Sequence, residues 1–106
     1  MVSIEDFQKL EFIIVKIKEV NEHPNADRLY VLKVDAGGED RLLVAGIRSS
    51  YIPEELIGKS VVMVSNLQPA TIRGEESHGM ILAASDDNTV AVLCPDRDVV
   101  LGSRVK

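Results

Sequence analysis

The sequence has few of the residues on which disulfide bonds, zinc sites and base-stacking surfaces depend. It holds one cysteine, Cys94, and two histidines, His23 and His78, so it forms neither an intrachain disulfide nor a common His/Cys zinc cluster. It has no tryptophan, two tyrosines and two phenylalanines, too few for a platform that stacks successive bases of a single strand. The longest apolar runs, at 80–84 and 90–94, are five residues each. We therefore expect no membrane-spanning segment, no signal peptide and a cytoplasmic location.

Patterns typical of catalysis are missing as well. No glycine pattern resembles a phosphate loop, and Ser77-His78 lacks the glycines of a nucleophile elbow. The acidic pairs Asp86-Asp87 and Glu54-Glu55 lie in an expected turn and at an expected helix start, where solvated acids are common. Cys94 is expected to be a small core residue. We predict a protein that is not an enzyme and that holds neither a cofactor nor a metal.

The length and the overall composition of the chain fit one globular domain. The chain has 106 residues, of which 45% are hydrophobic and 27% charged, as in an ordinary domain spanning 1–106. Its net charge of −5 argues against a strongly electrostatic nucleic-acid binder. Residues 16–73 nevertheless carry eight of the 12 basic side chains, against eight acids. A basic strip on an acidic body is compatible with this distribution.

The first half of the sequence predicts a short helix and three strands. Ser3 followed by Asp6 resembles a capping box in front of a helix. Residues 11–23 alternate between apolar and polar with one phase slip, which predicts a long strand bent by a bulge. Two β-forming runs, 29–36 and 41–46, flank Gly37-Gly38 and predict a hairpin.

The second half predicts a helix and further strands. Pro53 and Gly58 bracket a short helical segment. Strands are expected at 60–65 and 79–85, with a short sixth strand at 90–94 and a C-terminal extension, while the stretch 66–78 is predicted to be a long loop. Five main strands with a helix between the third and the fourth predict an all-β, five-stranded OB-fold barrel.

Ligands of OB-fold barrels meet two loops, which here are 21–28 and 66–78. In the first loop, His23 and Arg28 could be presented to a phosphate or a base edge, but the loop could equally serve only to turn the chain. In the second loop, Arg73 offers a cation and Ser77 a hydroxyl, and Met80, just after the loop, offers an exposed polarizable side chain. We favour a functional role for the second loop and leave both roles open for the first.

Six ordered blocks around these loops resemble one known family. They are His23–Tyr30, Val44–Arg48, Asn66–Pro69, Ile72–Gly74, Ser77–Met80 and Leu101–Val105. Together they are similar to the tRNA-binding domain family, which occurs at the C-terminus of methionyl-tRNA synthetases and in free-standing structure-specific tRNA-binding proteins. Because the blocks span nearly the whole chain, the resemblance is specific.

The resemblance implies an OB-fold that binds tRNA without catalysis, often as a homodimer, and assists a methionyl-tRNA synthetase catalytic subunit. The family's RNA-contact signature falls on Ser77, Gly79 and Met80, and position implies contacts at Lys16, Asn25, Arg28, Lys33, Asn66 and Arg73. Basic side chains would neutralise phosphates, Ser77 would bond a phosphate or a 2′-hydroxyl, and Met80 would lie against an unstacked base.

Three departures from the family pattern support a second hypothesis. Ile13 stands where the family typically has arginine, Val15 where it has glycine, and Gln68 where lysine is common. Together with the acidic total, they favour as an alternative a dimeric OB-fold protein-interaction module in which RNA binding is weak or lost.

Overall fold

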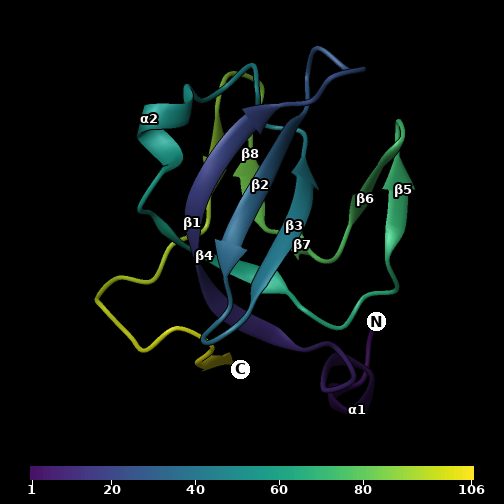
Figure 1. Cartoon of the computed structure of the whole chain (residues 1–106). Coiled ribbons are helices and arrows are strands. Elements are labelled where there is room, and N and C mark those ends of the chain that lie inside the picture. Colours follow the sequence, from purple (N-terminus) through teal and green to yellow (C-terminus); the bar gives the residue numbers. More distant parts are fainter.

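The computed structural model describes residues 1–106 as a mostly β structure with two short helices (Figure 1). A six-stranded sheet has the order β3-β2-β1-β4-β7, with β10 added to β1. Its strands are β1 (Phe12–Glu22), β2 (Tyr30–Asp35), β3 (Asp40–Ala45), β4 (Ser60–Val64), β7 (Met80–Ile81) and β10 (Arg104–Val105). Two hairpins stand outside this sheet: β5 (Ala70–Ile72) with β6 (Glu75–Ser77), and β8 (Ala83–Ser85) with β9 (Val90–Val92).

Strand β1 explains why the sheet curls. Its first half pairs with β4, from Phe12 to Lys16, and its second half pairs with β2, from Lys16 to Glu22. The register with β2 shifts between Ile17 and Glu19, which confirms the predicted bulge and bends the strand. The curled half-barrel that results is the OB-like β-barrel predicted from the sequence (Figure 1).

The core fills the inside of this curl. Its fully buried side chains come from β1, β2, β3, β4 and α2 (Pro53–Leu56): Val15, Ile17, Leu32, Val34, Leu43, Val61, Met63 and Leu56. The helix α2 begins at Pro53, and the Glu55 side chain accepts a hydrogen bond of 2.9 Å from the Ile52 backbone N–H. The predicted short helix between the third and fourth strands is thus confirmed.

The N-terminal helix α1 (Ile4–Phe7) is also confirmed. The Ser3 hydroxyl accepts a 3.1 Å hydrogen bond from the Asp6 N–H, and the Phe7 ring stacks on Phe12 with centroids 5.5 Å apart. No helix of the structure is long and apolar enough to cross a membrane.

Three local expectations are wrong. The predicted loop 66–78 contains the β5–β6 hairpin, and the predicted strand 79–85 is divided at Leu82 into β7 and β8. Leu82 still donates its N–H to the Val62 carbonyl at 3.0 Å, so the chain stays beside β4 while it changes partners. Cys94 is exposed and not in the core, because β9 ends at Val92.

Candidate nucleic-acid interface

The two loops singled out in the sequence meet in the structure. Loop 23–29 is closed at its base by a 3.1 Å hydrogen bond from the His23 N–H to the Leu29 carbonyl. Its Asn25 side chain donates to the Arg73 carbonyl at 3.3 Å, and the Arg73 guanidinium reaches the Asn25 carbonyl at 3.5 Å. The tip of the β5–β6 hairpin is therefore joined to loop 23–29, at the end of the sheet where β1 ends (Figure 1). We call these two segments together the loop–hairpin surface.

His23 lies inside this junction. Its side chain is 3% exposed, its Nδ1 accepts the Asn25 N–H at 3.0 Å, and its Nε2 lies 2.9 Å from the Ile72 carbonyl. Because Nδ1 accepts, the ring proton sits on Nε2 and is donated to Ile72. Presentation of His23 to a phosphate or base edge is therefore ruled out, since both ring nitrogens are already bonded.

Arg28 and Arg73 supply the charge of the loop–hairpin surface. Both side chains are exposed, and neither takes part in an ion pair. Arg73 also has a left-handed backbone, with φ of 54°, followed by Gly74 with φ of 91°, as in the tight turns that favour hairpins. These two cations are free to meet phosphates.

Arg48 is a residue whose role the sequence did not reveal. Its backbone N–H donates to the Arg28 carbonyl at 3.4 Å, its Nη1 donates to the Ala26 carbonyl at 3.2 Å, and its Nη2 pairs with Glu22. Arg48 thus supports loop 23–29 through the Ala26 and Arg28 carbonyls. Its place in the block Val44–Arg48 was the only signal in the sequence.

Lys16 and Lys33 lie elsewhere, on the sheet. Lys33 contacts Glu19 at 3.5 Å and Asp40 at 4.0 Å, so its charge is largely neutralised. Lys16 is exposed and unpaired, but it precedes Glu22 by six residues, about 20 Å along an extended strand. The structure does not bring these two lysines to the loop–hairpin surface.

Neighbouring charges on the sheet are matched as well. Lys18 donates to Asp40 at 3.0 Å, and this hydrogen bond raises the pKa of Lys18.

Asn66, another predicted contact, is engaged in holding the segment after α1. Its Oδ1 accepts the Glu11 N–H at 2.8 Å and its Nδ2 donates to the Lys9 carbonyl at 2.7 Å.

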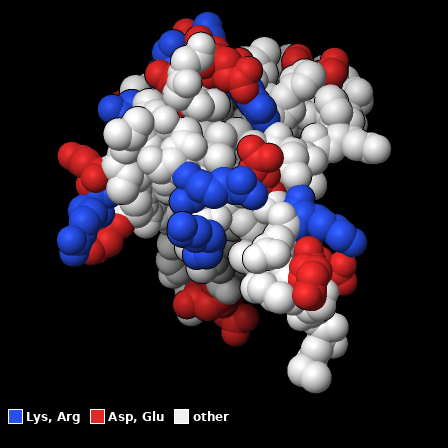
Figure 2. Space-filling model, turned by 90° about the horizontal axis from the view of Figure 1, so that it is seen from below, with Lys and Arg blue, Asp and Glu red and all other residues white.

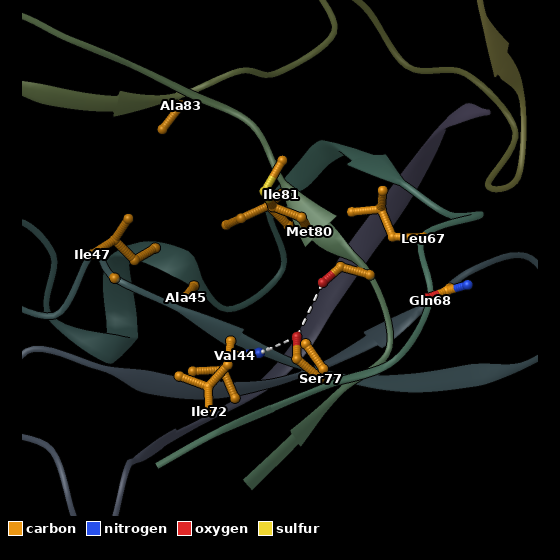
Figure 3. A pocket seen from close by; sticks show the side chains of 13 residues that line it. Val44, Ala45, Ile47, Leu67, Gln68, Ile72, Ser77, Met80, Ile81 and Ala83 are labelled. Atoms are coloured by element: carbon orange, nitrogen blue, oxygen red, sulfur yellow. Dashed lines mark hydrogen bonds between the residues drawn. The ribbon is translucent and has the colours of Figure 1, made fainter. Parts of the chain in front are cut away.

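A pocket of about 370 Å³ opens between the β5–β6 hairpin, the end of β3 and β7 (Figure 3). Nine of its 13 lining residues are hydrophobic, among them Ile47, Ile72 and Met80. Met80 is 47% exposed, which confirms that its side chain is accessible. The pocket offers an apolar surface that includes Ile72, the residue before Arg73.

Ser77 is buried in the wall of this pocket. Its side chain is 4% exposed, and its hydroxyl accepts the Val44 N–H and donates to the Gly79 carbonyl, both at 3.0 Å (Figure 3). Gly79 has φ of 139°, and a Cβ there would lie 3.0 Å from the Met63 sulfur. Ser77 and Gly79 therefore shape the pocket.

Half of the basic side chains are held in ion pairs. Six basic side chains are ion-paired, namely Lys9, Lys18, Lys33, Arg41, Arg48 and Arg97. The other six of the 12 are Lys16, Arg28, Lys59, Arg73, Arg104 and Lys106. Figure 2 shows basic and acidic side chains interspersed over one face, with a small basic group near its centre. A nucleic acid would thus meet local groups of cations.

Comparison with known proteins identifies the family. Residues 12–104 match the model of the family described as putative tRNA binding domain. The chain belongs to this family, which confirms the resemblance found in the sequence.

The relatives include methionine–tRNA ligases of archaea. This chain is 56% identical over 105 residues to that of Thermococcus kodakarensis and 49% identical over 106 residues to that of Nanoarchaeum equitans. These matches cover 99% and 100% of this chain but 14% of each ligase. The chain therefore spans about one seventh of the relatives' length.

Solved structures of similar length have the same fold. The MetRS-related protein of Pyrococcus horikoshii has a TM-score of 0.93 at 32% identity, over 100% of this chain and 98% of that one. The CsaA chaperone protein of Picrophilus torridus has a TM-score of 0.93 at 29% identity, over 100% of both chains.

Proposed function

We propose that this chain is a non-catalytic tRNA-binding module that recognises the shape and backbone of tRNA through the loop–hairpin surface and the adjoining pocket. The supporting observation is that two loops distant in sequence join there and carry two exposed arginines without acidic partners. Membership of the tRNA-binding family supplies the class of ligand.

In this proposal, Arg28 and Arg73 neutralise phosphates, which position the nucleic acid without reading its sequence. The pocket receives an unstacked base, against which the exposed Met80 side chain lies. Asn25 contributes by holding the hairpin tip, and Ser77 contributes by shaping the pocket wall, since its hydroxyl is already bonded on both sides.

We also propose that the module assists a methionyl-tRNA synthetase and works as a homodimer. The ligase relatives support the first point, because each contains this segment within a much longer chain. A weak tRNA-binding module raises the effective concentration of tRNA for the catalytic part to which it is joined. Exposed apolar residues of α1, such as Phe7, border a hollow shared with Val105 of β10, and a second copy would cover them.

A protein-interaction module is the second candidate function. It is favoured by the neutralised Lys33, by Ile13, which is buried at 8% exposure in the position of the family's arginine, and by the exposed apolar surface of α1. In that case the dimer would form while tRNA binding would be negligible.

The test is binding of total tRNA at low salt to the wild-type chain and to Arg73→Asn, with Arg97→Asn as the control. Asparagine tolerates the left-handed backbone of position 73 better than arginine does, so Arg73→Asn should fold as the wild type does. Arg97 lies beside Asp96 and is 85% exposed. We expect Arg73→Asn to bind several-fold more weakly, with a salt dependence of log affinity that is smaller by about 1, and Arg97→Asn to match the wild type.

Absence of tRNA retention by the wild type would reject the proposal and favour the interaction module. Equal affinities of the wild type and Arg73→Asn would reject the loop–hairpin surface as the binding site.

A further inference from the structure

We propose that His23 is a positioning residue of the loop–hairpin surface, because its ring fixes the tip of the β5–β6 hairpin against loop 23–29. This inference rests on the proposed function, since its consequence is the placement of Arg73 for tRNA. His23 itself does not contact the ligand, as its side chain is 3% exposed.

The hairpin needs such a support because no ladder joins it to the six-stranded sheet. Where the chain leaves the hairpin it is held by the His78 N–H, which donates to the Leu42 carbonyl at 2.9 Å, and by the hydroxyl of Ser77. The tip consists of Arg73 and Gly74, directly after Ile72. Near the tip, the hairpin accepts hydrogen bonds from outside at the Ile72 carbonyl, from His23, and at the Arg73 carbonyl, from Asn25.

One ring orders both sides of the junction. The His23 Nδ1 accepts the Asn25 N–H at 3.0 Å, and its Nε2–H donates to the Ile72 carbonyl at 2.9 Å. Asn25 then donates from its side chain to the Arg73 carbonyl at 3.3 Å. The two bonds of the ring require a neutral His23 side chain with its proton on Nε2.

Fixing the hairpin tip determines where the positive charge of Arg73 lies. With the tip fixed, Arg73 stays next to the loop that carries Arg28, and both can meet the same backbone. With the tip free, only part of the population has both arginines in place, and the apparent affinity falls by that fraction.

Two variants separate the two hydrogen bonds of the His23 ring, the one to the Asn25 N–H and the one to the Ile72 carbonyl. A glutamine amide reaches the place of Nε2 and keeps a donor for Ile72, whereas an asparagine amide reaches only the place of Nδ1 and keeps an acceptor for Asn25. The experiment measures affinity for total tRNA at low salt for His23→Gln and His23→Asn, below the melting temperature of each. Arg97→Asn is again the control, because Arg97 lies outside the loop–hairpin surface and is 85% exposed.

We expect His23→Gln to bind within about twofold of the wild type, and His23→Asn to bind about two- to tenfold more weakly, the factor of one net hydrogen bond. Arg97→Asn should match the wild type. Equal affinities of the two His23 variants, whether unchanged or reduced, would overturn the inference. In that case the hydrogen bond from His23 to the Ile72 carbonyl would have no separate effect on tRNA binding. If the wild type fails to bind tRNA, the proposed function is what fails.

A measurement on the wild type is independent of how the variants fold. The ¹⁵N resonances of the His23 ring should show the proton on Nε2 and a bare Nδ1. A proton on Nδ1 would overturn the inference, since that nitrogen could not accept from Asn25.

Discussion

The Ser77 hydroxyl is bonded entirely within the fold. It accepts from the Val44 N–H and donates to the Gly79 carbonyl, and the side chain is 4% exposed. In Ser77→Ala both backbone groups lose this partner. Because a buried group left without a hydrogen bond costs about 1–3 kcal/mol, we expect the free energy of unfolding to fall by about 1–3 kcal/mol, as measured by urea unfolding.

Ser85→Ala is the matched control for this residue. Ser85 lies in β8, is exposed and makes no side-chain hydrogen bond, so its removal should change stability by less than about 0.5 kcal/mol. A Ser77→Ala variant of unaltered stability that no longer binds tRNA would instead favour direct contact between Ser77 and RNA.

For single residues, the sequence predicted the features that depend on residues nearby in the chain. The Ser3 cap is a contact over three residues, and the exposure of Met80 was inferred from its place next to the second loop. Val44, one partner of Ser77, lies 33 residues away, and Ile72, one partner of His23, lies 49 residues away, so no local pattern pointed to these two contacts. The contacts that engage these side chains therefore became visible only in the folded chain.

The turn between β2 and β3 is an element whose stability should depend on pH. The Asp35 carboxylate accepts the Gly37 N–H at 2.8 Å and the Gly38 N–H at 3.3 Å. These bonds hold the pKa of Asp35 below its ordinary value of 3.8. The glycines have φ of 88° and 111°, a backbone that exposes their N–H groups to the carboxylate.

A lowered pKa means that the folded state favours the ionised carboxylate. The stabilisation by Asp35 is therefore fully present above about pH 4 and is lost as pH falls through the lowered pKa. We expect Asp35→Asn to melt at a lower temperature than the wild type at pH 7, and the difference to shrink as the pH falls below about 4. Asp98→Asn, at an exposed and unpaired acid, should show no such convergence. A difference that persists unchanged to pH 2 would contradict this account.

Long elements were predictable, while the β5–β6 hairpin was not. The strands β1 to β4 are five to 11 residues long, enough for alternation to show the buried face. The strands β5 and β6 have three residues each and flank Arg73-Gly74, so Pro69 and Gly74 made the stretch resemble a loop. What fixes this hairpin is contact with β3 and with loop 23–29, and such contacts leave no periodic signal.

Over the whole molecule, the net charge of −5 limits how tRNA can be bound. Six of the 12 cations are paired with acids, and two of the unpaired cations, Arg28 and Arg73, belong to the loop–hairpin surface. One chain would thus neutralise about two phosphates, which gives a slope of log affinity against log salt of about −2. Weak binding of this kind gains most from a second copy of the surface.

A homodimer that engages one tRNA with both copies would contact about four phosphates, and we expect a slope of about −3 to −4. Filter binding of total tRNA over a series of salt concentrations gives the slope, and sedimentation at micromolar concentration gives the mass. Arg28→Gln removes one cation from each copy, so it should reduce the slope by about 2 in a dimer and by about 1 in a monomer. A monomeric mass with a slope near −2 would contradict the dimer and leave tRNA binding intact, whereas affinity independent of salt would contradict phosphate contact itself.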